Sequence, residues 1–430
     1  MRAEGGRAET RRGKIGLPEL SVVWSRSSLV LVVPIVIYVA SLWLVRPVQL
    51  ALVTPGFLVL GFVAARVSRA QALEALGRVR IEFTMLSIIL LLSLLSLANH
   101  NEPLRSLRII YPAVLPMILF GQLLAIRSNS RDGVLLVPRL LLLTGLCLSV
   151  TPFILSFVLP PLKSYLFGSY RLKVFFDNSI QYAIALAVIF PIAVAEFTIA
   201  RRLVAKLAWA AVLIVMAYTL FRTGSKTAMF LTFTVATMLY ITISLRSRSL
   251  LHTLSLLVGV VLLGGLLWMY SLDVAEALDP KIAEKMRSIV EGGVKNYHSV
   301  ESRKLLWREA IDQGQQHWLI GTGAGEKVLG IEHAHNLVID YFKGIGVFGA
   351  AAVVVLCLCI FFRTAAKGLA VIAGRAIEDR DKRLLACYVG ASVYVVCNQM
   401  SDCFGPATIG GLWVVYLSAV LSERGRILRP

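Results

Sequence analysis

Long apolar runs separated by short polar stretches dominate the chain. Most of these runs are 17 to 22 residues long, the length that an α-helix needs to cross roughly 30 Å of hydrocarbon at about 1.5 Å per residue. The pattern predicts an all-α polytopic membrane protein with about 12 transmembrane helices. Their expected ranges are 29–45, 49–65, 82–98, 109–126, 140–158, 179–199, 205–221, 227–244, 251–270, 346–362, 385–401 and 407–421.

Composition supports the same fold class. The chain is 57% hydrophobic and 16% charged, and its mean hydropathy is +0.75, well above what soluble domains show. A strand barrel is excluded because the alternating pattern of its strands is absent. A basic lead like that of a signal peptide precedes the first run. Because that run is long and a second follows closely, we interpret it as an uncleaved anchor.

Basic residues set the expected orientation, because short basic loops stay on the cytoplasmic side of a membrane. With the N-terminus inside, the inner segments carry 27 of the 44 Lys and Arg residues, and the outer segments other than the largest carry 8. Both termini are therefore predicted to be cytoplasmic. The inner loops face anionic lipid headgroups and account for the net charge of +19 without a nucleic-acid partner.

One connection is much larger than the others, and we expect the chemistry there. The predicted organisation is a cytoplasmic tail over 1–28, nine spans over 29–270, a large loop on the outer side over 271–345, three spans over 346–422 and a second cytoplasmic tail over 423–430. The six cysteines lie in or at the ends of spans, without metal-site spacing. We assign them no chemical role.

Two cations interrupt apolar sequence in the segment LFRTGSKTAMF. Arg222 and Lys226 are four residues apart and could share one helix face. One interpretation is an anion site, because the outer ends of spans normally lack such residues. The other is that both side chains reach the interface and merely end two helices. The pattern alone leaves both open.

A helix is predicted across SRKLLWREAIDQGQQHW, with Ser302 as its expected cap. Arg303 is followed by Leu306, Trp307 and Ala310 at helical spacing. Arg303 is therefore either a solvated residue on an amphipathic helix or an anion ligand. A guanidinium suits the second role because it can hold phosphate with two parallel hydrogen bonds.

The stretch GTGAGEKVLG has the glycines of a phosphate-binding loop but not its other residues. A nucleotide-binding loop needs Lys directly after the last glycine, whereas here Glu326 follows Gly325. We interpret the stretch as a flexible turn that bends the chain back to the membrane.

Two histidines, His333 and His335, precede a segment with apolar residues at every fourth position. The spacing predicts a short helix that begins near Asn336 and lies against the bilayer. His335 would lie at the positive end of the helix dipole, which favours a neutral imidazole that can accept a proton. The alternatives are an ordinary interfacial histidine, or a metal pair with Glu332 and Asp340 as further ligands.

The order of these motifs resembles the O-antigen ligase and polymerase superfamily. SRKLLWREAIDQGQQHWLIGTGAG followed by HAHNLVIDYFKGIGVFG is similar to its signature of an Arg-x-x-x-Trp helix, a Gly-x-Gly turn, a His-Asn pair and a Gly-x-x-Gly. The likeness covers about residues 220–350. The N-terminal half agrees only in span count and loop placement. The resemblance implies a GT-C-like glycosyltransferase architecture with one large periplasmic loop.

The resemblance also implies roles for single residues. The family's essential histidine falls on His335 and its loop arginine on Arg303. A second family arginine falls on Lys226, a departure that leaves open whether Lys226 or Arg222 fills that role. Arg171 resembles a further family arginine. The residues expected to contact the pyrophosphate or the acceptor are Arg222, Arg171, His333 and Asn336.

Within this superfamily, a chain with a single large loop resembles the ligases best. A ligase transfers polysaccharide from undecaprenyl pyrophosphate to a lipid A-core sugar at the periplasmic face of a Gram-negative inner membrane, so donor, acceptor and membrane lipid are the implied partners. No cofactor or metal is expected. The alternatives are a polymerase or a protein O-oligosaccharyltransferase of the same superfamily and, in another class, a lipid-linked oligosaccharide flippase. A flippase should carry cations deep through the bundle, whereas these cations gather at its outer edge.

Overall fold

The structure, a computed structural model, describes residues 67–96, 103–129, 133–158, 179–247, 298–323, 326–331, 334–373, 378–398 and 406–423. All regular secondary structure in these ranges is helical, apart from one isolated bridge between Val328 and Ile331. The predicted all-α class is therefore confirmed for this part of the chain. The helices are α3 (Arg69–Arg78), α4 (Arg80–Ser96), α5 (Pro103–Asn129), α6 (Gly133–Val158), α8 (Ser179–Ile199), α9 (Leu203–Arg222), α10 (Lys226–Ser247), α14 (His298–Gln316), α15 (Leu337–Ala373), α16 (Asp379–Asn398) and α17 (Pro406–Ser422).

Most of the predicted spans fall on these helices. Nine of the 12 coincide with described helices, from α4 to α6, α8 to α10 and α15 to α17. The predicted spans 29–45, 49–65 and 251–270 lie outside the described residues. Within the described ranges, five helices are long and apolar enough to cross a membrane, or six if α3 and α4, bent by 83°, form one broken span. The chain is thus a helical, multi-pass type of membrane protein, and the total of 12 stays a prediction.

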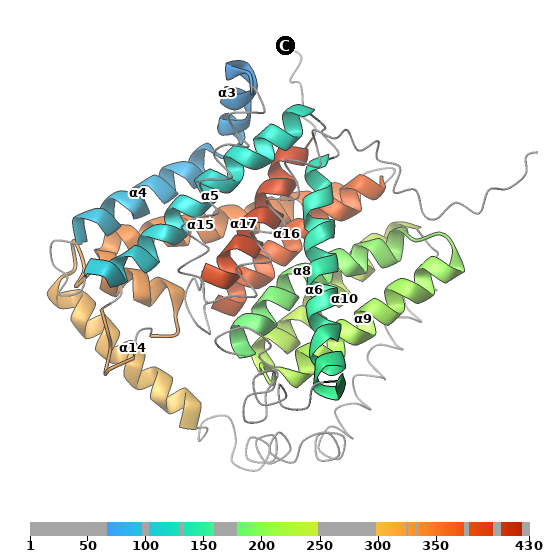
Figure 1. The fold of residues 1–430 in the computed structure, drawn as a ribbon. Helices are drawn as coiled ribbons and strands as arrows, with labels where there is room; N and C mark the ends of the chain where they lie inside the picture. The colour runs from blue at the N-terminus through green and yellow to red at the C-terminus, as the bar shows by residue number, and fades with distance from the viewer. Residues whose placement is uncertain are drawn as a thin grey trace, which may run out of the picture.

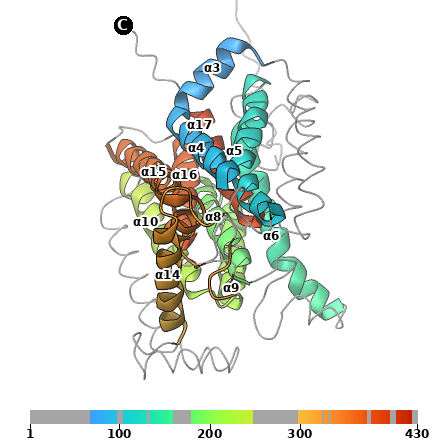
Figure 2. The same cartoon turned by 90° about the vertical axis from the view of Figure 1, so that its left-hand side faces the viewer.

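Helix α8 forms the centre of the bundle (Figures 1 and 2), and its residues from Tyr182 to Glu196 are all buried. It packs against α6, α9, α10, α16 and α17. A helix that is apolar on every side needs such a surrounding. Gly390 of α16 lets two backbones approach closely, because a Cβ atom there would lie 2.2 Å from the carbonyl oxygen of Val188.

Buried ion pairs fasten one end of the bundle. Glu82, at the start of α4, accepts a hydrogen bond at 2.8 Å from Nε of Arg363, near the end of α15. Glu196, near the end of α8, pairs with Arg139 of α6 at 3.0 Å and with Arg383 of α16 at 2.8 Å. A carboxylate withdrawn from water needs such partners. These contacts therefore hold the ends of five helices together.

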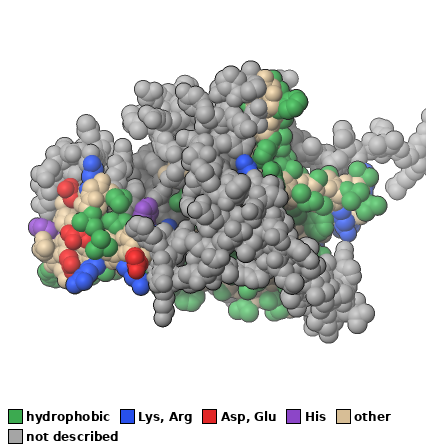
Figure 3. Space-filling view, turned by 90° about the horizontal axis from the view of Figure 1, so that it is seen from below, with side chains coloured by type: hydrophobic (Ala, Val, Ile, Leu, Met, Phe, Trp, Pro, Cys, Tyr) green, Lys and Arg blue, Asp and Glu red, His purple; other side chains and the backbone are tan. Residues whose placement is uncertain are grey.

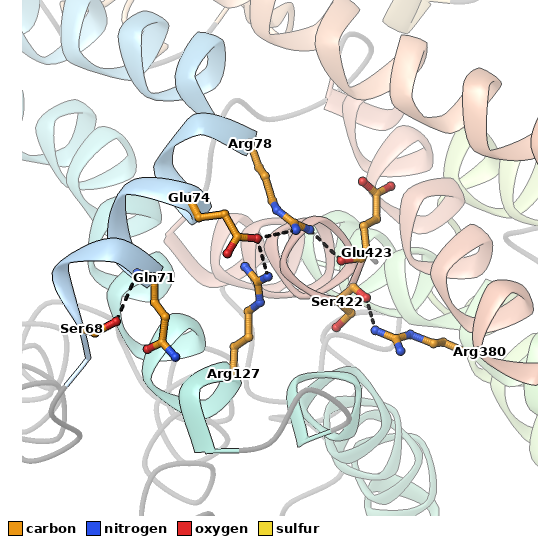
Figure 4. Close-up of polar contacts among 8 residues, drawn as sticks. All are labelled: Ser68, Gln71, Glu74, Arg78, Arg127, Arg380, Ser422 and Glu423. Carbon is orange, nitrogen blue, oxygen red and sulfur yellow. Dashed lines mark hydrogen bonds and ion pairs between the residues drawn. The ribbon is translucent and has the colours of Figure 1, made fainter. Parts of the chain in front are cut away.

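A more exposed network lies at the same end (Figure 4). Glu74 of α3 pairs with Arg78 at 2.7 Å and with Arg127 of α5 at 3.1 Å, and Arg78 also donates to the carbonyl of Glu423 at 2.6 Å. The hydrogen bond from Arg78, with that from Arg127, outweighs partial burial and holds the pKa of Glu74 below its usual value. The basic helix ends that the sequence predicts to be cytoplasmic thus lie together, and α15 begins at the opposite end.

Candidate functional site

Helix α14, which lies at the periphery beside the first turns of α15 (Figures 1 and 2), carries Arg303. The helix begins at His298, so the prediction that Ser302 caps it is wrong. Glu301 in its first turn favours this earlier start, because a carboxylate is stabilised near the positive end of the helix dipole. Arg303 is half-buried, whereas Ser302 and Lys304 on either side of it are exposed. Arg303 therefore lies toward the packed side of α14.

The packed side of α14 contacts the segment before α15. Arg303 lies one turn before Leu306 on this side. Leu306 belongs to the same buried cluster as Ala334, and Ala334 directly precedes His335. The packing thus places Arg303 and His335 on two segments that share one small core. That cluster consists of Leu306, Ala310, Val328 and Ala334, with Trp307 and Ile339 packed against it.

His335 occupies a turn with unusual backbone geometry. Its φ of 57° lies in the left-handed region, which costs a residue with a side chain roughly 1–2 kcal/mol. Asn336 caps the helix that follows: its carbonyl accepts the N–H of Asp340 at 2.9 Å, and its Oδ1 accepts the N–H of Ile339 at 3.1 Å. Helix α15 begins at Leu337, so the predicted start near Asn336 is confirmed. This contact gives Asn336 a structural role in ordering the turn.

A buried pair of charges lies beneath the histidine turn. Oδ1 of Asp340 accepts the N–H of Ala334 at 2.8 Å. Nζ of Lys343 lies 4.0 Å from the same oxygen and donates to the carbonyl of Glu326. Asp340 is 8% exposed and Lys343 2%. The pair therefore ties the turn at His335 and the segment 326–331 to the first turns of α15.

The glycine-rich stretch is held tightly against a break in α15. That helix is kinked at Gly346, whose φ is 78° and ψ −174°. The N–H groups of Thr322 and Gly323 donate to the carbonyls of Lys343 and Gly344 at 2.8 and 3.1 Å. Val347 N–H in turn donates to the carbonyl of Trp318 at 2.8 Å. Residues 321–323 of the predicted flexible turn GTGAGEKVLG are therefore docked, because their amides hold the end of α14 against the kink. Residues 324 and 325 of that stretch lie outside the described residues.

Arg222 and Lys226 end two different helices. Arg222 is the last residue of α9 and Lys226 the first of α10, with Gly224 at φ 66° between them. The prediction that the two residues could share one helix face is thus wrong, because the three residues between them form a turn that reverses the chain. Thr219, near Arg222, donates to the carbonyl of Ser149 in α6 at 3.4 Å. Arg222 thus lies at the same end of the bundle as the start of α15, on the side of α6 and α8.

The remaining predicted residues are not tested. Arg171, His333 and Glu332 lie outside the described residues, so the histidine pair and its metal-ligand alternative stay open. Among the residues that the structure describes, no three His, Cys, Asp or Glu side chains lie together in an arrangement that could hold a metal ion.

The outward surface of α14 carries both signs of charge. Figure 3 shows basic, acidic and hydrophobic side chains intermixed on this part of the molecule. Its exposed charged residues include Glu301, Lys304, Arg308 and Asp312. An anion would therefore find no broad positive field on this surface, and the half-buried Arg303 is a local cation instead.

Next to this surface, where α14 meets the kink of α15, lies an exposed apolar patch, which we call the outer lip. Trp318 is 57% exposed and Phe348 56%. The other members are Leu319, Ile320 and Val347. The outer lip continues into the exposed side chains of α15, a helix long and apolar enough to span a membrane.

The sequence of this region matches a known family. A family model described as O-antigen ligase matches residues 211–354, a range that contains Arg222, Lys226, Arg303 and His335. No curated protein matches the chain. The resemblance seen in the order of the motifs is confirmed, and with it the general class of membrane glycosyltransferase-like enzymes. Over residues 211–354, about a third of its length, the chain is therefore similar to the O-antigen ligase family.

Proposed function

We propose that this protein is an O-antigen ligase that transfers polysaccharide from undecaprenyl pyrophosphate to a sugar hydroxyl of lipid A-core at the periplasmic face of the inner membrane. The observation that carries the proposal is the shared core of α14 and the segment before His335, inside the family match. This core joins the two segments that carry the Arg303 guanidinium and the His335 imidazole, and transfer from a pyrophosphate to a hydroxyl needs both of these functions.

The donor requires cations rather than an acid. Pyrophosphate is a good leaving group, and fixed positive charges stabilise the negative charge that develops as its bond to the sugar breaks. Arg303 supplies a fork of parallel N–H donors. Arg222 or Lys226 adds a second positive charge, and Lys226 would act as a point charge only. Because side-chain cations do this work, the transfer is expected to proceed in the presence of a chelator.

The acceptor requires a base. His335 takes the proton of the acceptor hydroxyl while its oxygen attacks the anomeric carbon and the bond from that carbon to the pyrophosphate oxygen breaks. Attack from the face opposite the leaving group inverts the configuration at the anomeric carbon, as in single-displacement glycosidases. The position of His335, in a turn at the start of α15, suits a reaction between two lipid-borne substrates at the membrane surface.

The charge distribution supports this orientation. The ion-paired helix ends lie opposite the start of α15, and the excess of basic residues falls in the segments at that ion-paired end. Short basic segments stay cytoplasmic. We therefore place the ion-paired end at the cytoplasm and His335 at the periplasm.

Reconstitution of the purified protein in liposomes tests the proposal. The liposomes contain lipid-linked polysaccharide and lipid A-core, with and without chelator, and the product is polysaccharide-bearing lipid A. His335→Ala is expected to stay folded and to abolish this product. His317→Ala is the matched control, because His317 is exposed directly after the last residue of α14. Its backbone carbonyl, which the substitution keeps, accepts the N–H of Gly321.

Other outcomes point to other functions. Donor chains that lengthen without lipid A indicate a polymerase, and sugar on an added protein acceptor indicates a protein O-oligosaccharyltransferase. Donor that crosses the bilayer without forming a new bond indicates a flippase. Unchanged product from the His335→Ala variant would refute the role of His335 as base.

A further inference from the structure

The residue before the proposed base is held by a buried carboxylate. We infer that Asp340 is a positioning residue for His335: its carboxylate, braced by Lys343, fixes the main chain at Ala334 and thereby the direction of the imidazole. The inference rests on the proposed function, in which His335 removes the acceptor proton.

Asp340 forms one hydrogen bond with the residue before His335 and one with the residue after it. On one side, Oδ1 of Asp340 accepts the N–H of Ala334 at 2.8 Å. On the other, the N–H of Asp340 donates to the carbonyl of Asn336 at 2.9 Å. His335 lies between the two clamped residues at a φ of 57°. Because a left-handed conformation is unfavourable for a residue with a Cβ, it persists only where surrounding contacts impose it. Asp340 provides contacts on both sides.

Lys343 extends the clamp toward α14. Its buried ammonium lies 4.0 Å from Oδ1 of Asp340 and donates to the carbonyl of Glu326. Glu326 opens the segment that leads to Val328, and Val328 belongs to the cluster that includes Leu306 of α14. The Asp340 and Lys343 pair thus connects the turn of the proposed base to the helix that carries the proposed phosphate ligand.

A purely structural role is the competing explanation, because a buried ion pair often does no more than satisfy its own charges. The two explanations predict different kinetics for a variant that lacks Oδ1 of Asp340. If Asp340 orients His335, the loss of the hydrogen bond to Ala334 lowers the rate of proton removal more than it lowers donor binding. A displacement of about 1 Å at a reacting group costs on the order of 100-fold in rate.

The test compares Asp340→Asn, which keeps an acceptor oxygen, with Asp340→Leu, which has a similar size and no acceptor. The first readout is hydrogen exchange of the Ala334 amide, followed by mass spectrometry. The second is transfer rate against donor concentration in the liposome assay. Asp340→Asn is expected to keep the protection of the Ala334 amide and most of the rate. Asp340→Leu is expected to lose that protection and on the order of 100-fold in kcat, with little change in the KM for donor.

Glu82→Gln is the matched control, because Glu82 is also a buried, ion-paired carboxylate but lies at the other end of the bundle. It is expected to lower thermal stability without changing Ala334 exchange or the rate per folded molecule. The inference is overturned if Asp340→Leu retains the wild-type rate, if Asp340→Asn loses as much as Asp340→Leu, or if Glu82→Gln reproduces the loss.

The proposed function can fail separately. If the wild-type protein transfers no sugar while the exchange of Ala334 follows the expected pattern in both variants, the assignment as a ligase falls and the clamp on His335 stands. If the wild-type protein transfers sugar and the Asp340→Leu variant does so at the same rate, the ligase stands and the positioning role falls.

Discussion

Nε of Arg363 lies 2.8 Å from Oε1 of Glu82, and this ion pair joins α15 to α4 at the end of the bundle opposite His335. Glu82 is 1% exposed and also accepts a hydrogen bond from the hydroxyl of Tyr416 in α17 at 2.5 Å. The helix that starts at the proposed catalytic turn is thereby anchored to two others far from the chemistry. The anchor should matter for stability and leave the chemistry unchanged.

Glu82→Ala is expected to lower the free energy of unfolding by about 3 kcal/mol, the lower end of the range for a buried pair, because the Arg363 guanidinium that loses its carboxylate is only partly withdrawn from water. Denaturant unfolding in detergent measures this loss. Glu74→Ala is the control, because the side chain of Glu74 is 57% exposed and an exposed pair contributes under about 1 kcal/mol. Equal losses in the two variants would contradict the importance of burial at Glu82.

Gly346→Ala is expected to destabilise the protein and to reduce sugar transfer, because the added Cβ would lie 2.2 Å from the carbonyl oxygen of Leu319. Gly330→Ala is the control, because it causes the same backbone strain as Gly346→Ala without the steric clash. Gly330 has a similar φ of 80°, but nothing lies within 4 Å of its Cβ position. Its substitution should cost only the roughly 1–2 kcal/mol of a left-handed residue. Unfolding and transfer assays on both variants check the difference, and a Gly346→Ala variant no worse than Gly330→Ala would contradict the tight docking of the end of α14.

The hydrophobic pattern predicts a helix best where charges mark both of its ends. Helix α8 covers Ser179–Ile199, the predicted range, because Asp177 precedes the apolar run and Arg201 follows it. Helix α16 begins at Asp379 instead of the predicted 385. Its first turns are charged and read as a loop, yet Arg383 pairs with Glu196 and brings them into the bundle. A hydropathy pattern cannot predict that a charged turn belongs to a buried helix when an ion pair with another helix is what buries it.

The geometry of the candidate site depended on contacts between distant segments. The spacing of Arg222 and Lys226 suggests one helix face only if the helix continues, and Gly224 ends it. The residue before His335 donates a hydrogen bond to Asp340, five residues further on, and the backbone at Gly346 lies against the carbonyl of Leu319. The family signature located these motifs in the sequence, but the spacing of residues does not predict which distant segments pack against them.

Arg303→Lys is expected to raise the KM for donor about tenfold, a factor that corresponds to about 1.4 kcal/mol, because lysine keeps the charge but loses the parallel donors. Lys304→Ala is the matched control: Lys304 is the exposed neighbour on the outward side of α14, and its loss should leave the KM unchanged. Donor titrations in the liposome assay measure both values. If the two variants behave alike, Arg303 is a solvated arginine on an amphipathic helix, the interpretation that the pattern left open.

Trp318, in the outer lip, is expected to lie at the boundary between lipid headgroups and acyl chains. Its side chain is 57% exposed, the patch around it is apolar, and the patch continues into the exposed side of α15. Tryptophan favours this depth because its ring is apolar and its N–H is polar. The fluorescence of Trp318 is the difference between the wild-type protein and the Trp318→Phe variant. In liposomes with brominated lipids, bromines near the headgroups should quench this difference more than bromines near the ends of the acyl chains. Trp307→Phe is the control, because Trp307 packs against the buried cluster of α14. The fluorescence lost in this variant should be quenched little by bromine at either depth. If aqueous iodide quenches the Trp318 component and brominated lipid does not, the outer lip faces water, and α14 is held to the membrane only through α15.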